Sequence, residues 1–191
     1  MSYNIDKDFD AHIKLVNEIY ESQELQEKIK QAISLISKTY KKGGKVLFCG
    51  NGGSAADAEH LAGEFSGRFL IERPALPAEA LHSNSASLTA IANDYGYNKA
   101  FARLLESKAK KNDVLYLMTT SGRSENVKAA IAEAIKLKVK VIALTGKTRI
   151  KSYGKSGLHI ELPSTETPRI QEAMMLVGHI ICGGVEKELF G

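Results

Sequence analysis

Short apolar runs alternate with helical stretches along most of the chain. Five runs are predicted to be strands, because most are continuously apolar, as parallel strands covered on both faces are. They span residues 45–49, 76–81, 113–118, 140–144 and 158–162. The stretches with helical spacing cover residues 55–67, 85–92, 98–109, 125–138 and 168–189. This alternation predicts a doubly wound α/β fold, a three-layer sandwich with a five-stranded parallel sheet between two layers of helices.

An N-terminal helical arm is predicted before the first strand. Residues 4–40 carry two apolar stripes at helical spacing, with Ser22 as the break or cap between them. The arm and the apolar last helix are too hydrophobic for the surface of a monomer. We therefore expect a single domain over residues 1–191, in which residues 1–42 form an arm used in oligomerisation.

Two glycine- and serine-rich turns stand where a phosphate group would bind. Residues 49–54 (Cys-Gly-Asn-Gly-Gly-Ser) follow the first predicted strand, and residues 119–124 (Thr-Thr-Ser-Gly-Arg-Ser) follow the third. Each leads into a predicted helix, whose first N–H groups and dipole attract anions. Ser54 is expected to cap its helix and to contact phosphate. The pair of turns suggests a bound phosphorylated metabolite, although tight connections without a ligand remain the alternative.

Two pairs of polar residues are candidates for acid–base or metal chemistry. His60 and Glu64 are four residues apart, which places them on one helix face, where a solvated pair is the alternative. Gln171 and His179 lie on the apolar last helix, where a core histidine bonded to a carbonyl is the alternative. Their separation corresponds to about 12 Å of helix, so a single ion could be reached by both only at full side-chain stretch. Either one of them lies outside the ligand set, or the two serve sites in different subunits.

Three further polar groups are candidates for contacts with sugar hydroxyls. They are Asn51 in the first turn, Arg68 after the helix that follows it, and Asp94 after the predicted helix 85–92. A helix cap or a surface ion pair is the alternative for each of them.

Composition narrows the classes of partner. The formal net charge is +4, Trp is missing, and the lysine clusters are spread along the chain, so we expect no nucleic-acid binding. Cys49 and Cys182 are predicted to be buried free thiols of a reducing compartment. The sequence contains no secretory apolar segment and no apolar run of about 18 residues. We therefore expect a cytoplasmic protein that does not bind membranes.

The motifs, taken in order, resemble those of the phosphoheptose isomerases, which are built on the sugar isomerase (SIS) domain with its flavodoxin-like sheet. The resemblance covers essentially the whole chain. It is carried by residues 49–60 (Cys-Gly-Asn-Gly-Gly-Ser-Ala-Ala-Asp-Ala-Glu-His), 66–68, 93–96, 120–126, 144–147, 169–172 and His179. The family isomerises sedoheptulose 7-phosphate to D-glycero-D-manno-heptose 7-phosphate through an enediolate, and its product feeds the lipopolysaccharide or related glycans of bacterial surfaces.

The resemblance implies a role for individual residues. Glu64 would be the base that moves a proton between C1 and C2, with His179 as its acid–base partner. One Zn²⁺ per subunit would be held by His60, Glu64, Gln171 and His179. The residues implied in substrate binding are Asn51, Gly52, Gly53, Ser54, Arg68, Asn93, Asp94, Thr119, Thr120, Ser121, Ser124 and Gln171. The family also implies a homotetramer with sites at the subunit interfaces.

Two other functions remain open from the sequence. One is a non-catalytic SIS protein that binds a sugar phosphate and associates with the replication initiator; such a relative resembles this chain at residues 73–77 and 88–94. That relative lacks the equivalents of Glu64 and His179, which this chain has, so the enzyme is favoured. The other is isomerisation of a pentose or hexose phosphate.

Overall fold

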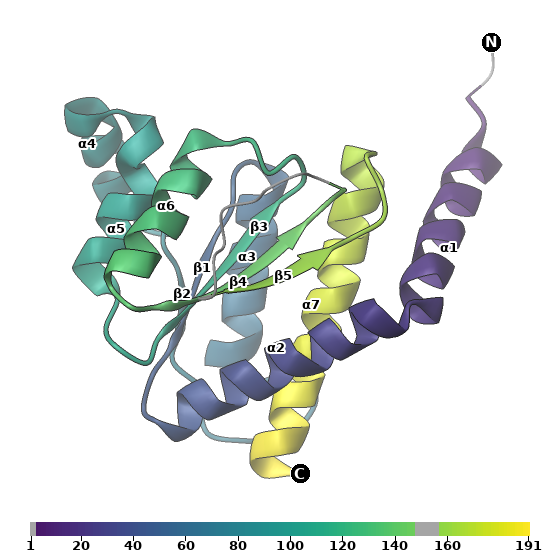
Figure 1. The fold of residues 1–191 in the computed structure, drawn as a ribbon, viewed down its shortest axis with the longest axis horizontal. Helices are drawn as coiled ribbons and strands as arrows, with labels where there is room; N and C mark the ends of the chain where they lie inside the picture. Colours follow the sequence, from purple (N-terminus) through teal and green to yellow (C-terminus); the bar gives the residue numbers. More distant parts are fainter. Residues whose placement is uncertain (1–2, 148–156) are drawn as a thin grey trace.

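A parallel sheet forms the middle layer of the protein (Figure 1), for which a computed structural model describes residues 3–147 and 157–191. The strands are β1 (Val46–Cys49), β2 (Ala78–Ala80), β3 (Val114–Thr119), β4 (Lys140–Thr145) and β5 (Gly157–Glu161). Their order is β2-β1-β3-β4-β5, and every neighbouring pair is parallel. The five predicted strands are therefore confirmed. The run 76–81 pairs over only three residues, since Pro77 has no N–H to donate at the start of this edge strand.

Helices cover both faces of the sheet, because successive strand residues point to opposite sides. In β1, Val46 and Phe48 belong to one core, and Leu47 and Cys49 to the other. The helices after β1 are α3 (Gly53–Ser66), α4 (Ser85–Tyr95), α5 (Ala100–Lys108), α6 (Glu125–Lys136) and α7 (Thr167–Phe190), with a short 3₁₀ helix, η1 (Tyr97–Lys99), before α5. The first core includes α3 and α7, and the second includes α5 and α6. The predicted three-layer α/β sandwich is confirmed.

The N-terminal arm consists of two helices, α1 (Ile5–Glu21) and α2 (Gln23–Lys41). Ser22 separates them and caps α2, because its hydroxyl accepts a hydrogen bond from the Leu25 N–H at 3.3 Å. Helix α2 packs on the sheet beside α7, whereas α1 extends away from the three layers (Figure 1). The predicted helical arm, with its break at Ser22, is therefore confirmed.

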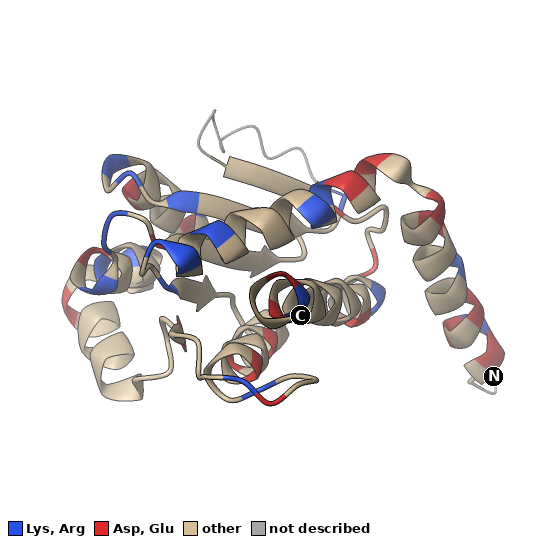
Figure 2. Cartoon of the chain, turned by 90° about the horizontal axis from the view of Figure 1, so that it is seen from below, with Lys and Arg blue, Asp and Glu red and all other residues tan. Residues whose placement is uncertain are grey.

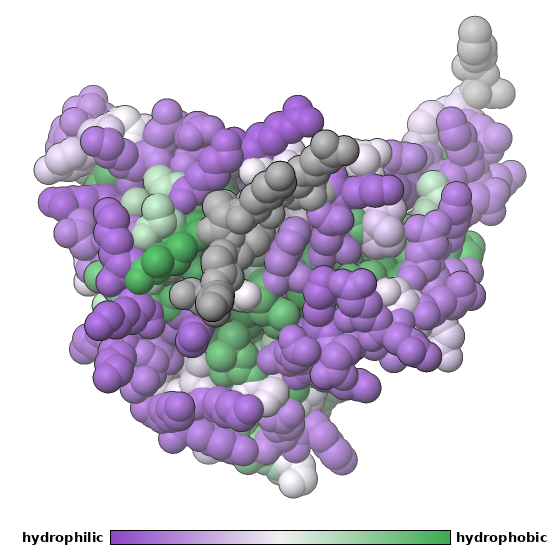
Figure 3. Space-filling view, in the orientation of Figure 1, coloured by the Kyte–Doolittle hydropathy of each residue, from purple (hydrophilic) through white to green (hydrophobic). Residues whose placement is uncertain are grey.

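One face of α1 exposes a stripe of large apolar side chains. The stripe is formed by residues that are all more than half exposed: Ile5, Phe9, Ile13 and Tyr20. Figure 3 shows apolar side chains on this part of the surface among polar ones. Their spacing of four, four and seven residues keeps them on one side of the helix. An exposed apolar helix face of this kind marks a surface for association.

The basic residues are less evenly spread than the sequence predicts. Figure 2 shows Lys and Arg along α2 and at the neighbouring edge of the sheet. Five lysines and one carboxylate line a surface hollow of about 280 Å³, namely Lys38, Lys42, Lys111, Lys138, Lys140 and Asp113. They gather because the end of α2 and the starts of β3 and β4 meet at the amino edge of the sheet. Among the described residues, no helix has the length and apolar character that crossing a membrane requires.

Candidate functional site

The two predicted phosphate turns lie side by side at the carboxyl edge of the sheet. The first joins β1 to α3, and the second joins β3 to α6; β1 and β3 are neighbours in the sheet. The strand order reverses between them, since β2 lies beyond β1 and β4 lies beyond β3. Open α/β sheets bind ligands at such a switch point, outside the carboxyl ends of the strands. The structure thus brings the two turns together as the sequence predicts.

The first turn ends at a glycine cap. Gly52 is the residue before α3, and its φ of 56° lies in the left-handed region that favours glycine. The prediction that Ser54 caps this helix is wrong, because Ser54 lies inside the first helical turn, where its side chain is buried. Its backbone N–H bonds to the Asn51 carbonyl at 3.1 Å. The Ser54 hydroxyl therefore does not cap α3, and its contact with phosphate remains a prediction.

The second turn uses its own hydroxyls to hold its shape. Thr119 Oγ1 accepts a hydrogen bond from the Gly122 N–H, and Ser121 Oγ accepts one from the Arg123 N–H, both at 3.2 Å. Ser124 occupies the cap position before α6, yet its side chain makes no capping hydrogen bond. The turn therefore presents hydroxyls and helix N–H groups at one place, as an anion site requires.

A pair of asparagines joins the two turns. Asn51 Nδ2 donates to Asn126 Oδ1, and Asn126 Nδ2 donates to Asn51 Oδ1, both at 2.9 Å. The hydroxyl of Tyr97, on η1, donates to Asn51 Oδ1 at 2.8 Å. Asn51 is a predicted substrate residue, but in this structure its side chain is occupied by these contacts. The sequence analysis missed the roles of Asn126 and Tyr97, although Asn126 belongs to the motif 120–126 and Tyr97 directly follows the motif 93–96.

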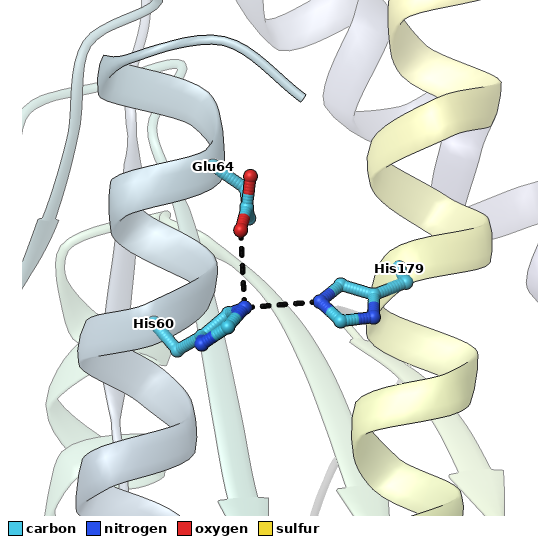
Figure 4. Close-up of side chains that lie close together, drawn as sticks. All are labelled: His60, Glu64 and His179. Carbon is cyan, nitrogen blue, oxygen red and sulfur yellow. Dashed lines mark hydrogen bonds and ion pairs between the residues drawn. The ribbon is translucent and has the colours of Figure 1, made fainter. Parts of the chain in front are cut away.

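Three of the four predicted acid–base and metal residues meet between two helices. Figure 4 shows His60 and Glu64 on α3 pointing toward His179 on α7. The Nε2 atom of His60 lies 3.0 Å from His179 Nε2 and 3.0 Å from Glu64 Oε1. One donor atom from each residue lies within 4.8 Å of the others. His60 is exposed, and Glu64 and His179 are half-buried, so the cluster is open to a ligand.

This donor set fits a divalent metal ion. Two imidazole nitrogens and a carboxylate oxygen are typical ligands of catalytic zinc, which keeps a further position for water or substrate. Ligand nitrogens about 2.0–2.1 Å from a tetrahedral ion lie roughly 3.3 Å apart, close to the spacing of the two Nε2 atoms.

The buried thiol beside the cluster does not belong to the donor set. Cys182 lies three residues after His179, and burial raises its pKa to about 12, with a further contribution from the charges of Glu64 and Glu186. The donor atoms that converge at the cluster are those of His60, Glu64 and His179, and Cys182 Sγ is not among them. Cys49 and Cys182 are both free and buried, as the sequence predicts.

Gln171 lies at the phosphate turn rather than at the histidine cluster. A Cβ atom at Gly53 would overlap Gln171 Nε2, which places this amide at the start of α3. His179 is eight residues further along α7, or about 12 Å. Within one chain, Gln171 and His179 therefore do not reach the same ion, and a shared ion remains a prediction that involves a second copy.

Three other predicted substrate residues lie outside these contacts. Arg68 follows the far end of α3, where its side chain is exposed near Glu72 at 3.8 Å. Asn93 and Asp94 lie within the last turn of α4, because this helix continues to Tyr95 and not to residue 92 as predicted. Asn93 Nδ2 donates to Asp94 Oδ1 at 2.9 Å, and both residues are exposed. Their roles in substrate binding remain predictions.

Comparisons with known proteins identify the family to which the chain is similar. The family model described as the SIS domain matches residues 9–146. The phosphoheptose isomerase of Helicobacter pylori is 44% identical over 183 residues, which cover 96% of this chain and 94% of that protein. The phosphoheptose isomerase of Clostridium acetobutylicum is 41% identical over 187 residues, covering 98% and 95%. A solved structure of a phosphoheptose isomerase from Francisella tularensis superimposes with a TM-score of 0.91 at 35% identity, covering 96% of each chain.

Proposed function

This chain belongs to the SIS-domain family and, within it, to the phosphoheptose isomerases, and on that basis we propose that it converts sedoheptulose 7-phosphate into D-glycero-D-manno-heptose 7-phosphate. The observation that supports this most directly is the joint placement of Glu64 and His179, since a protein that only binds a sugar phosphate needs neither. In this isomerisation C1 and O1 each lose a proton, while C2 and O2 each gain one. Because the chain has both Glu64 and His179, the non-catalytic alternative is not retained.

Each of the reacting protons has a proposed carrier. Glu64 Oε1 lies 3.0 Å from His60 Nε2, which leaves Oε2 to take the proton from C1 and return it to C2. The ring of His179 packs against the rings of His60 and Phe69, with centroids 5.1 and 5.2 Å away, and these contacts hold its orientation. With its Nε2 assigned to the metal ion, His179 would use Nδ1 to move the proton between O1 and O2. Such positioned proton transfers accelerate reactions by about 10²–10⁴-fold.

The phosphate of the substrate is assigned to the two turns. The N–H groups at the starts of α3 and α6 supply donors, and their helix dipoles add positive potential. The hydroxyls assigned to phosphate oxygens are those of Ser54, Thr119, Ser121 and Ser124. The amide of Thr120 is assigned the same role.

Zinc is the metal that the donor set fits best. His60, Glu64 and His179 would hold one ion per subunit, and Gln171 of a neighbouring copy is the candidate for a further ligand. The ion would polarise the substrate oxygens and stabilise the negative charge that develops on them. The residues that move the protons are the chain's own.

Completion of the site is assigned to a homotetramer. Gly53 begins α3 and Glu64 lies near its end, eleven residues or about 16 Å further along the helix. The phosphate turns and the histidine cluster of one chain are therefore far apart, and Arg68 lies further still. Association through the exposed stripe of α1 would allow the turns of one copy to meet the cluster of another.

A cytoplasmic location and a biosynthetic role complete the proposal. The two free buried cysteines suit a reducing compartment. The heptose 7-phosphate produced would be activated and transferred to a bacterial surface glycan.

The test is conversion of sedoheptulose 7-phosphate by the purified protein, with added zinc and with a chelator. We expect turnover that the chelator abolishes and zinc restores. Turnover that resists the chelator would contradict the metal assignment. An absence of turnover by a folded, zinc-loaded protein would contradict the reaction itself.

A further inference from the structure

A buried ion pair lies beside the histidine cluster. Arg73 Nε donates to Glu186 Oε1 at 2.8 Å, and the two side chains are 1% and 2% exposed. Arg73 lies in the segment after α3, whereas Glu186 lies on α7, seven residues after His179. Charges that are taken out of water require several hydrogen bonds to remain satisfied. The hydrogen-bond partners of Arg73 and Glu186 therefore show which segments of the chain the pair connects.

Arg73 binds the carboxyl-terminal end of α3. Its Nη2 donates to the carbonyl of Glu64 at 2.7 Å, and its Nη1 donates to the carbonyls of Phe65 and Gly67 at 2.9 and 3.0 Å. The last carbonyls of a helix have no partners within it, and a cation at this end also favours the helix dipole. The guanidinium thus fixes the backbone of Glu64 itself.

Glu186 binds the loop that follows α3. Its carboxylate accepts hydrogen bonds from the backbone N–H groups of Phe69, Leu70 and Ile71, at 2.9, 2.8 and 3.3 Å. This anchoring sets the position of the Phe69 ring, which stacks on His179 at 5.2 Å with an interplanar angle of 24°. The Glu186 carboxylate on α7 therefore influences the orientation of His179, because it holds the loop that carries Phe69.

We infer that Arg73 and Glu186 are positioning residues for the cluster of His60, Glu64 and His179. Together they join the end of the helix that carries His60 and Glu64 to the helix that carries His179. The pair thereby fixes the separation of α3 and α7 and the setting of the Phe69 ring, on which convergence of the three donor atoms depends. The inference rests on the proposed metal function of this cluster.

The experiment measures zinc affinity in Arg73→Lys and Glu186→Gln. Arg73→Lys keeps the charge but loses the planar set of donors, and Glu186→Gln keeps the shape but loses the charge. We expect the Kd for zinc to rise by about 10–100-fold in each, the effect typical of residues that orient metal ligands. Cobalt(II) serves as a second probe, because its visible spectrum should shift when the ligand geometry changes. The Kd for inorganic phosphate, which reports on the two distant turns, should stay within about twofold.

The matched control is Asp113→Asn. Asp113 is a second buried carboxylate, paired with Lys45 Nζ at 2.6 Å and accepting bonds from the N–H groups of Lys45 and Lys110, but it lies at the amino edge of the sheet. Its substitution should lower the melting temperature without changing zinc affinity. An equal loss of zinc affinity in Asp113→Asn would overturn the inference, as would unchanged zinc affinity in both test variants.

Two further outcomes are decisive. If neither test variant folds, Phe69→Leu decides, because it leaves the ion pair intact and removes only the ring that stacks on His179. Unchanged zinc affinity and an unchanged cobalt spectrum in Phe69→Leu would then overturn the inference. Failure of the unaltered protein to bind zinc would overturn the proposed metal and the inference together, whereas binding that the variants retain overturns the inference alone.

Discussion

Asn51 and Asn126 exchange two hydrogen bonds of 2.9 Å, so that each side-chain amide donates to the carbonyl of the other. Asn51 lies in the turn after β1, and Asn126 lies in the first turn of α6, after β3. The pair therefore fixes the distance between the two turns to which the substrate phosphate is assigned. Asn126 is buried, and its Oδ1 also accepts a bond from the Val127 N–H at 2.9 Å, so its amide cannot rotate freely.

Asn126→Leu should weaken phosphate binding without changing the chemistry of the cluster. Leu is similar in size but leaves the Asn51 amide without its partner, at a cost of about 1–3 kcal/mol. We expect a raised KM, a raised Kd for inorganic phosphate, and a kcat that changes much less. Tyr97→Phe removes one hydrogen bond from the same network and should give a smaller effect in the same direction. An unaltered KM in Asn126→Leu would show that the pair only stabilises the fold.

Glu64→Gln should lower turnover steeply while the protein remains folded and able to bind phosphate. The amide keeps the shape of the side chain but cannot accept the proton from C1. We expect kcat to fall by about 10²–10⁴-fold, the usual contribution of a positioned base. The Kd for inorganic phosphate should be unchanged, since the turns lie at the other end of α3. Normal turnover would remove Glu64 as the base.

Mixing two inactive variants tests whether the site is shared between copies. Glu64→Gln lacks the proposed base, and the double variant Ser121→Ala/Ser124→Ala lacks two proposed phosphate ligands. If the turns of one copy serve the cluster of another, oligomers reassembled from both variants contain some sites in which every residue is intact. We expect the mixture to regain part of the lost activity, whereas each variant alone does not. A mixture that exchanges subunits but stays inactive would contradict shared sites.

The sequence predicted the elements and the chemistry better than it predicted distances. Continuously apolar runs and helical stripes are local signals, so five strands, the break at Ser22 and the two turns were all found. The cap of α3 was misassigned to Ser54, because a glycine at φ 56° caps through its backbone and leaves no side-chain signal. The gathering of Lys38, Lys111 and Lys140 was also missed, since it arises only when distant segments meet.

The candidate site shows the same limit. His60 and Glu64 are neighbours on one helix, and their pairing follows from spacing alone. Their meeting with His179 depends on how α3 and α7 pack. The family resemblance implied this meeting, whereas the periodicity of the sequence does not show how two helices pack. Arg73 and Glu186 are 113 residues apart, and nothing in the chain's pattern joins them before the fold is known.

Phe9→Glu with Ile13→Glu should break the assembly. Both residues are more than half exposed on the apolar stripe of α1, so charges there would be buried without partners on association. We expect a lower mass by light scattering and loss of activity, with the helical content retained. Lys14→Glu is the matched control, because it introduces the same charge on the exposed polar face of the same helix. Equal masses for the double variant and the control would place the interface elsewhere.

Glu186→Gln should also alter how stability depends on acid. Burial raises the pKa of Glu186, but the N–H groups of Leu70 and Phe69, the Arg73 side chain and the Ile71 N–H lower it by more, so the folded value lies below the ordinary 4.5. A carboxyl of this kind stabilises the fold fully above its ordinary pKa, and the contribution is lost as the pH falls through the folded value. At pH 7 the variant should be less stable by about 3–5 kcal/mol, because the Arg73 charge stays buried without the opposite charge of Glu186.

The free energy of unfolding in urea, measured from about pH 7 to pH 3, tests this expectation. Below about pH 4.5 the unaltered protein should lose stability more steeply than Glu186→Gln, so that the two curves converge, because only the unaltered protein takes up a proton at this site on unfolding. Glu72→Gln serves as the control, since the Glu72 side chain is almost fully exposed, and its curve should follow that of the unaltered protein. Parallel curves for Glu186→Gln and the unaltered protein would mean that folding does not lower the pKa of Glu186.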